Sequence, residues 1–160
     1  MTNNDILRRL RYAFDFSNPK ATELFCLDPA SSVVITNDQL LAKLAKEEDA
    51  EFSSCTDIEL AAFLDGLIVS KRGLREPPVS PLAKPDDFRL TKNDILKKLR
   101  IAMNFREQEM LATLELGGST LSKAELSALF RKPSHKHFRA CGNQVLRNFI
   151  KGLTTQLRES

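Results

Sequence analysis

The sequence contains no tryptophan and only one tyrosine, Tyr12, so its aromatic content rests on ten phenylalanines. Tryptophan and tyrosine are the flat, amphipathic side chains on which unpaired bases commonly stack. Their scarcity argues against a binding surface built from a row of such rings. A polyanion-binding surface on this chain would therefore depend mainly on charge.

Long apolar runs are also missing. No window approaches the roughly 18 apolar residues that a membrane-spanning helix requires, because charged residues interrupt the longest candidates. The N-terminal stretch MTNNDILRRLRYAF lacks the uninterrupted apolar segment of a secretory signal. We therefore expect a soluble, cytoplasmic protein with no membrane partner.

Cysteine is scarce, with only Cys26, Cys55 and Cys141, which lie far apart in the chain. An odd number at wide spacing is unlike the dense, even framework of a secreted domain held by disulfides. We expect free thiols that are mostly buried.

The overall composition is that of a globular protein. Of the 160 residues, 42% are hydrophobic and 28% are charged, and the formal net charge is +3. These values disfavour a disordered or coiled-coil chain. The length suits one medium-sized domain or two small ones.

An internal duplication favours two copies of one fold. Residues 2–16 (TNNDILRRLRYAFDF) align with residues 91–105 (TKNDILKKLRIAMNF) at an offset of 89, with nine of fifteen positions identical. Residues 39–67 align with residues 125–153 at an offset of 86, so three residues have been gained or lost near residues 29–31. The identical pairs of this second alignment are Leu40/Leu126, Ala42/Ala128, Lys46/Lys132, Phe52/Phe138, Cys55/Cys141, Leu60/Leu146, Phe63/Phe149, Gly66/Gly152 and Leu67/Leu153.

Each copy is predicted to form about four helices, because capping signals precede apolar residues spaced three and four apart. The expected helices are 2–14, 19–27, 36–46 and 57–69 in the first copy and 91–103, 107–116, 122–131 and 143–157 in the second. The predicted fold class is therefore all-α, an internal tandem duplication. A copy of about 70 residues has a thin core, so we expect the two to pack together.

A proline-rich segment separates the copies. Residues 71–90 hold four of the seven prolines, Pro77, Pro78, Pro81 and Pro85. Proline lacks a backbone donor and breaks helix interiors, so this segment is predicted to be a linker. The expected domains are 1–70 for the first helical repeat, 71–90 for the linker and 91–160 for the second repeat.

Gly66 and Gly152 fall at matched places in the last helix of each copy, although a mid-helix glycine costs about 1 kcal/mol relative to alanine. The repeated glycine indicates either close approach to a ligand or a tight helix crossing where only a hydrogen atom fits. The crossing is the favoured interpretation.

The segments NDILRRLRYAF and NDILKKLRIAM, which open the copies, and ELSALFRKPSHKHFRACGNQVLRNFIKGL, which closes the second, resemble the YehS-like family. That family comprises small bacterial proteins built from a duplicated domain of unknown function. The resemblance covers essentially the whole chain and implies an all-helical tandem repeat. It implies no activity, cofactor or catalytic residue.

Charge distinguishes the two copies. Residues 1–90 hold 11 basic and 15 acidic side chains, a net charge of −4, whereas residues 91–160 hold 13 and 6, a net charge of +7. The acidic run Glu47, Glu48, Asp49 and Glu51 of the first copy aligns with residues 133–137, which contain no acid. The candidate binding residues of the second copy are Arg131, Lys132, His135, Lys136, His137, Arg139, Arg147 and Lys151.

This basic surface predicts contact with phosphates, and nucleic acid is the partner we favour. Two alternatives remain open: the surface docks on acidic protein, or it is simply solvated. In the first alternative the protein is an interaction adaptor, or a homodimer in which the basic second copy of one chain meets the acidic first copy of another.

Motifs for catalysis or cofactor binding are weak. His135, His137 and Cys141 lie within seven residues, but a fourth zinc ligand is lacking. Residues 110–132 loosely resemble a helix-turn-helix, although the connection 117–122 is longer than its usual turn. Asp94 with the pair Lys97-Lys98, repeated from the first copy, is interpreted as helix electrostatics. We therefore predict a non-enzymatic binding or regulatory module without cofactor or metal.

Overall fold

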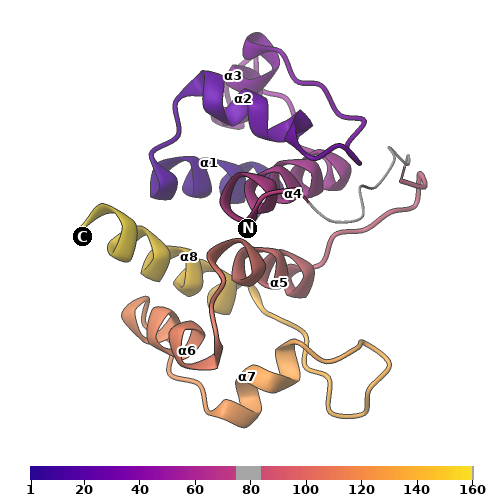
Figure 1. Cartoon of the computed structure of the whole chain (residues 1–160). Helices are drawn as coiled ribbons and strands as arrows, with labels where there is room; N and C mark the ends of the chain where they lie inside the picture. The colour runs from indigo at the N-terminus through magenta and orange to yellow at the C-terminus, as the bar shows by residue number, and fades with distance from the viewer. Residues whose placement is uncertain (75–83, 160) are drawn as a thin grey trace. The chain divides into compact units, whose positions relative to one another are not determined.

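The computed structural model describes residues 1–74 and 84–159, and within these ranges it contains eight α-helices and no strand (Figure 1). The chain divides into two compact units, Met1–Leu90 and Thr91–Ser160. The first unit contains α1 (Asn3–Phe14), α2 (Asn18–Leu27), α3 (Asn37–Leu44) and α4 (Asp57–Arg72). The second contains α5 (Lys92–Met103), α6 (Glu107–Leu116), α7 (Lys123–Leu129) and α8 (Asn143–Arg158). The all-α prediction is confirmed.

The helices begin where the capping signals predict. Five helices start with a capping box, in which the side chain of the residue before the helix accepts the N–H three positions on, and an oxygen of the Asp, Gln or Glu side chain at that position accepts the N–H of the cap residue. The five cap residues are Thr2, Thr36, Thr56, Thr91 and Ser122. Ser17 caps α2, and Pro19 occupies its first turn, where a missing N–H costs nothing.

The first helix of each unit ends in the same way. Asp15 and Asn104 adopt left-handed backbone conformations with φ of 55° and 56°. The next carbonyl, of Phe16 or Phe105, accepts a hydrogen bond from the guanidinium of Arg11 or Arg100 at 3.2 and 3.1 Å. The bond from the arginine to the phenylalanine carbonyl recurs in both units and therefore fixes where the chain turns toward the second helix.

The core of each unit lies between its second and fourth helices, α2 against α4 and α6 against α8. The apolar faces of α4 and α8 point into it: Leu60, Phe63, Leu64 and Leu67 on α4 are fully buried, as are their counterparts on α8. The ring of Phe63 contacts the rings of Phe16 and Phe25, and the ring of Phe149 contacts that of Phe105.

The matched glycines lie at these helix crossings. A Cβ atom added to Gly66 would lie 1.7 Å from the carbonyl oxygen of Leu24, and one added to Gly152 would lie 2.0 Å from that of Thr113. Backbone of the neighbouring helix therefore occupies the space beside each glycine. The tight crossing is confirmed.

Several boundaries differ from the sequence prediction. Helices α3 and α7 end at Leu44 and Leu129, two residues earlier than predicted, and α4 continues three residues beyond the predicted Val69, to Arg72. Of the predicted linker, Pro77, Pro78 and Pro81 lie outside the described residues. Leu90, at its end, donates its N–H to Asp57 Oδ2 at 3.0 Å and so is anchored on the first unit.

None of the helices in the described ranges combines the length and the apolar character needed to cross a bilayer.

Candidate functional site

The basic loop, defined here as residues 131–139, connects α7 to the extended segment that precedes α8 in the second unit. Asn93, on the first turn of α5, holds both ends of it. Its Nδ2 donates to the carbonyls of Leu129 and Arg139, both at 2.9 Å, and its Oδ1 accepts the N–H of Cys141 at 2.8 Å. One side chain thus fixes three backbone groups.

The first unit repeats this clamp with different residues around it. The Nδ2 of Asn4 donates to the carbonyls of Lys43 and Ser53, both at 2.9 Å, and its Oδ1 accepts the N–H of Cys55 at 3.0 Å. The asparagine of the repeated NDIL sequence is therefore structural. Because only backbone groups are held, the same clamp supports an acidic loop in one unit and a basic loop in the other.

Local hydrogen bonds fold the basic loop into two tight turns. The N–H of His135 donates to the carbonyl of Lys132 at 2.9 Å, and the N–H of Phe138 donates to the carbonyl of His135 at 3.0 Å. The N–H of His137 donates to Nδ1 of His135 at 3.0 Å. These bonds satisfy the backbone and leave the side chains of residues 132–137 exposed to solvent.

Six of the eight predicted binding residues share this loop, and the other two do not. Arg147 and Lys151 lie one turn apart on α8, and Arg147 donates to Gln144 on the same helix at 2.9 Å. Within residues 84–159 no hydrogen bond or ion pair joins either of them to the loop. Figure 1 shows α8, in yellow, leading away from the loop.

The carboxylate of Glu125 is paired with the loop. Glu125 Oε2 lies 3.2 Å from the guanidinium of Arg139, and Glu125 Oε1 accepts the N–H of Ser122 at 2.9 Å. The hydrogen bond from Ser122, and to a lesser extent Arg139, lowers the pKa of Glu125. Among the described residues Lys132 and Lys136 have no such partner, so their ammonium groups are available to a ligand.

The thiols are free, as predicted, and two of the three are buried: Cys55 and Cys141, whereas Cys26 is exposed. Burial raises the pKa of the Cys55 thiol to about 12 and raises that of Cys141 as well. Both thiols are therefore protonated at neutral pH, whereas a nucleophile or a metal ligand would need to be a thiolate. In the described part of the chain no three His, Cys, Asp or Glu side chains converge on a possible metal position.

A hollow of about 490 Å³ opens beside the basic loop, and we call it the α5–loop hollow. One side is formed by the start of α5, the other by the end of α7 and by the extended segment before α8. The lining residues are Thr91, Lys92, Asn93, Asp94, Lys97, Leu129, Phe130, Arg131, Lys132, Pro133, Phe138, Ala140 and Cys141.

Sequence reasoning missed most of this hollow. The sequence predicts a role in helix electrostatics for Lys97 and no binding role for Lys92, Phe130 or Phe138. The signal that joins them is Asn93, which brings residues about 40 positions apart into contact. Local patterns carry no such information.

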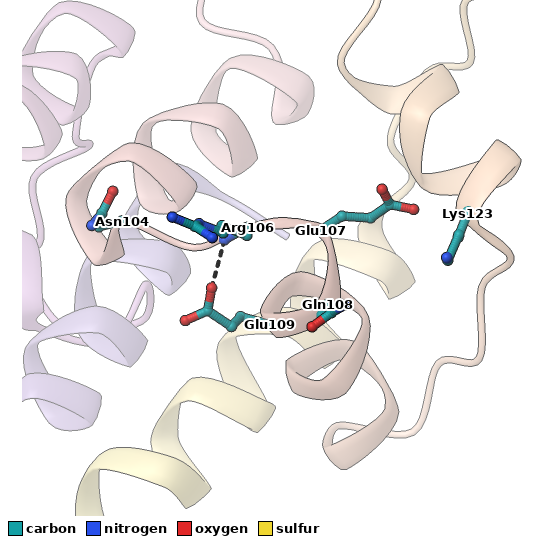
Figure 2. Close-up of a pocket in the computed structure, with 6 residues that line it drawn as sticks. All are labelled: Asn104, Arg106, Glu107, Gln108, Glu109 and Lys123. Carbon is teal, nitrogen blue, oxygen red and sulfur yellow. Dashed lines mark hydrogen bonds between the residues drawn. The ribbon is translucent and has the colours of Figure 1, made fainter.

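A second hollow, of about 550 Å³, lies at the start of α6 and is lined by polar side chains (Figure 2). Figure 2 shows Glu107 extending toward α7, which carries Lys123, while the N–H of Arg106 donates to Glu109 Oε1 at 2.8 Å. The described residues that line this hollow are all polar, and among them two basic and two acidic side chains balance one another. It therefore offers little to select a particular ligand.

These observations define a two-unit helical protein whose units share one fold and differ in surface charge. The chain belongs to the family described as "Protein of unknown function (DUF1456)", whose model matches residues 3–73 and 92–159. The uncharacterized protein YehS of Escherichia coli (strain K12) is 39% identical over 156 residues, which cover 98% of this chain and 96% of that protein. No solved structure matches the chain. The resemblance to the YehS-like family is confirmed.

Proposed function

We propose that the protein is a non-enzymatic binding module that contacts nucleic-acid phosphates through the basic loop. The observation that carries this proposal is the set of cations on the loop, beside which the described residues place the carboxylate of Glu125, paired with Arg139, and that of Asp94, which accepts the N–H of Thr91. Lysine and arginine bind nucleic acid by displacing the counterions of the phosphates, and this requires exposed charge rather than a deep site.

The number of available cations sets the expected strength. Among the residues that the structure describes, Arg131, Lys132 and Lys136 are the basic side chains of the loop that are not paired with an acid. If each contacts one phosphate, the logarithm of the binding constant should fall with the logarithm of the salt concentration with a slope of about −2 to −3. Binding of this kind is weak and depends little on base sequence.

A salt titration tests the proposal. Binding of labelled single-stranded and duplex DNA and RNA is followed by fluorescence anisotropy for the wild type and for Lys132→Glu/Lys136→Glu. The matched control is Arg9→Glu/Lys46→Glu, which makes the same change in net charge at exposed positions of the first unit. We expect the loop variant, and not the control, to abolish binding and its salt dependence. Equal losses in both variants, or no binding of wild type at low salt, would contradict the proposal.

A protein interface is the second candidate. It is favoured by the acidic loop of the first unit, where Glu47, Glu48, Asp49 and Glu51 are all exposed on the same clamped backbone. A dimer formed by the basic loop of one chain and the acidic loop of another should dissociate as salt is raised. Light scattering over a range of protein concentrations at low and high salt measures this, and a constant monomer mass would eliminate the homodimer.

A further inference from the structure

The α5–loop hollow combines two features that a flat basic patch lacks. Its polar lining includes four cations, Lys92, Lys97, Arg131 and Lys132, and one acid, Asp94, whose carboxylate accepts the N–H of Thr91 at 3.0 Å. Its remaining wall is mostly apolar and contains two aromatic rings, those of Phe130 and Phe138. A hollow with cations and an apolar wall suits a ligand that is anionic at one end and flat and apolar at the other.

The first unit shows what the same place looks like when the protein's own side chains bridge it. Arg8, the counterpart of Lys97, donates to the carbonyl of Ala45 at 2.8 Å and forms an ion pair with Asp5. Lys43, the counterpart of Leu129, donates to the carbonyl of Ser54 at 3.1 Å. In the first unit Arg8 thus connects α1 to the chain after α3, and Lys43 connects α3 to the segment before α4.

In the second unit these bridges are replaced. Lys97 stands at the position of Arg8, and Leu129, whose side chain cannot donate a hydrogen bond, stands at the position of Lys43. Within residues 84–159, neither Lys92 nor Lys97 has a side-chain hydrogen bond or ion pair that would hold it. Their charges therefore line the hollow without an internal partner.

We propose that the α5–loop hollow binds a single nucleotide, with its phosphate on the lysines and its base against the apolar wall. The volume lies within the range of about 300–1,000 Å³ that is typical of small-molecule sites. The guanidinium of Arg100 lies 4.6 Å from the ring centre of Phe130 and covers that ring, so Phe138 is the residue assigned to contact the base. The site deepens the proposed function and rests on it, since Arg131 and Lys132 belong to both.

Amide chemical shifts of the full-length protein provide the first test, because the duplication supplies an internal control. On titration with adenosine 5′-monophosphate we expect shifts at the amides of Thr91 to Lys97 and of Phe138 to Cys141. The corresponding amides of the first unit, Thr2 to Arg8 and Phe52 to Cys55, should not move. Shifts that are equal in the two units, or absent from the second, would overturn the site.

Two further probes test the ligand class. Adenosine, which lacks the phosphate, and inorganic phosphate, which lacks the base, should each bind more weakly than adenosine 5′-monophosphate by about tenfold or more, because each makes only part of the contacts. If inorganic phosphate bound as tightly as the nucleotide, the hollow would be an anion site with no role for the apolar wall, and the proposal would be wrong.

Variants test the two sides of the hollow separately. Ala140→Phe should fill the space and abolish nucleotide binding, whereas Ser54→Phe, at the corresponding exposed position of the first unit, should leave it unchanged. Lys97→Gln should weaken binding about tenfold through the loss of one charged hydrogen bond, with Arg9→Gln as its control. If folded Ala140→Phe, checked by circular dichroism, still bound the nucleotide, the assignment would fail.

The last comparison separates the site from the proposed function. Lys136 belongs to the basic loop and does not line the hollow, so Lys136→Glu should weaken binding of long DNA and spare the mononucleotide. If the nucleotide binds and long DNA does not, the hollow is a mononucleotide site and the proposed nucleic-acid function is wrong. If single strands bind more tightly with a 5′-phosphate than with a 5′-hydroxyl, the terminal nucleotide is the ligand.

Discussion

Replacing the buried ion pair of the first unit with the apolar pair of the second should leave the first unit folded. Lys43 Nζ lies 3.1 Å from Glu59 Oε1, and the two side chains are only 6% and 20% exposed. At the corresponding places the second unit has Leu129 and Val145. The backbones are equivalent there, since Asn4 and Asn93 hold the carbonyls of Lys43 and Leu129 in the same way.

The single variants should be costly in unequal amounts. Glu59→Val leaves a buried ammonium group with only the carbonyl of Ser54, 3.1 Å away, which should cost about 3–5 kcal/mol of unfolding free energy. Lys43→Leu should cost less, about 1–3 kcal/mol, because Glu59 still accepts the N–H of Thr56 at 2.9 Å in the capping box of α4.

The double variant Lys43→Leu/Glu59→Val should cost at least about 2 kcal/mol less than the sum of the single changes, because no buried charge is left without a partner. Loss of the bond from the N–H of Thr56 to the Glu59 carboxylate sets a small remaining cost of about 1 kcal/mol, while Thr56 Oγ1 still accepts the backbone N–H of residue 59 and caps α4.

Chemical unfolding measures these differences in the intact chain. The protein has no tryptophan and its one tyrosine, Tyr12, lies on α1, so tyrosine fluorescence reports on the first unit while circular dichroism reports on both. Additive costs, with the double variant as unstable as the two single changes together, would refute the argument that the charges are coupled.

Further predictions concern the glycines and the thiols. Gly66→Ala and Gly152→Ala should each lower the free energy of unfolding in urea by about 1–3 kcal/mol or more, because the added Cβ overlaps the backbone of the neighbouring helix. Gly142→Ala is the control, since a Cβ there meets nothing within 4 Å. An equal loss of stability in the control would contradict the reasoning. In alkylation followed by mass spectrometry at neutral pH, the exposed Cys26 should react first, and rapid labelling of Cys55 or Cys141 in the folded protein would argue against their burial. Folding raises the pKa of Cys55 from 9.0 to about 12, so the protonated thiol stabilises the native state below pH 9, and this contribution should be lost as the pH rises from about 9 to about 12. Cys55→Ala should flatten that part of the pH profile of the unfolding free energy.

The helix starts could be predicted because their causes are local. A threonine or serine followed three residues later by Asp, Gln or Glu satisfies the first backbone donors wherever it occurs, and five such sequences mark five observed starts. The ends of α3 and α7 could not be predicted in this way. They are set by Asn4 and Asn93, which draw the carbonyls of Lys43 and Leu129 toward a distant helix.

The same distinction between local and distant causes applies to the candidate site. The charges of the basic loop follow from composition and from comparison of the two copies, and the loop is exposed because its backbone is satisfied by its own turns. The α5–loop hollow depends on residues from three separate segments, and Lys97 lines it only because Asn93 holds the loop beside α5. A pattern read along the chain describes neighbours in sequence, whereas a pocket is made by neighbours in space.

The asparagine clamp makes the loop it holds an exchangeable module. All three bonds of Asn93 go to backbone groups, and the intervening chain has the same length in both units, 12 positions from Lys43 to Cys55 and from Leu129 to Cys141. Side chains between the anchor points can therefore change sign or size without disturbing the anchors. After duplication, one copy was free to acquire a new surface while the other kept its own, and grafted loops of this length should be accepted at either position.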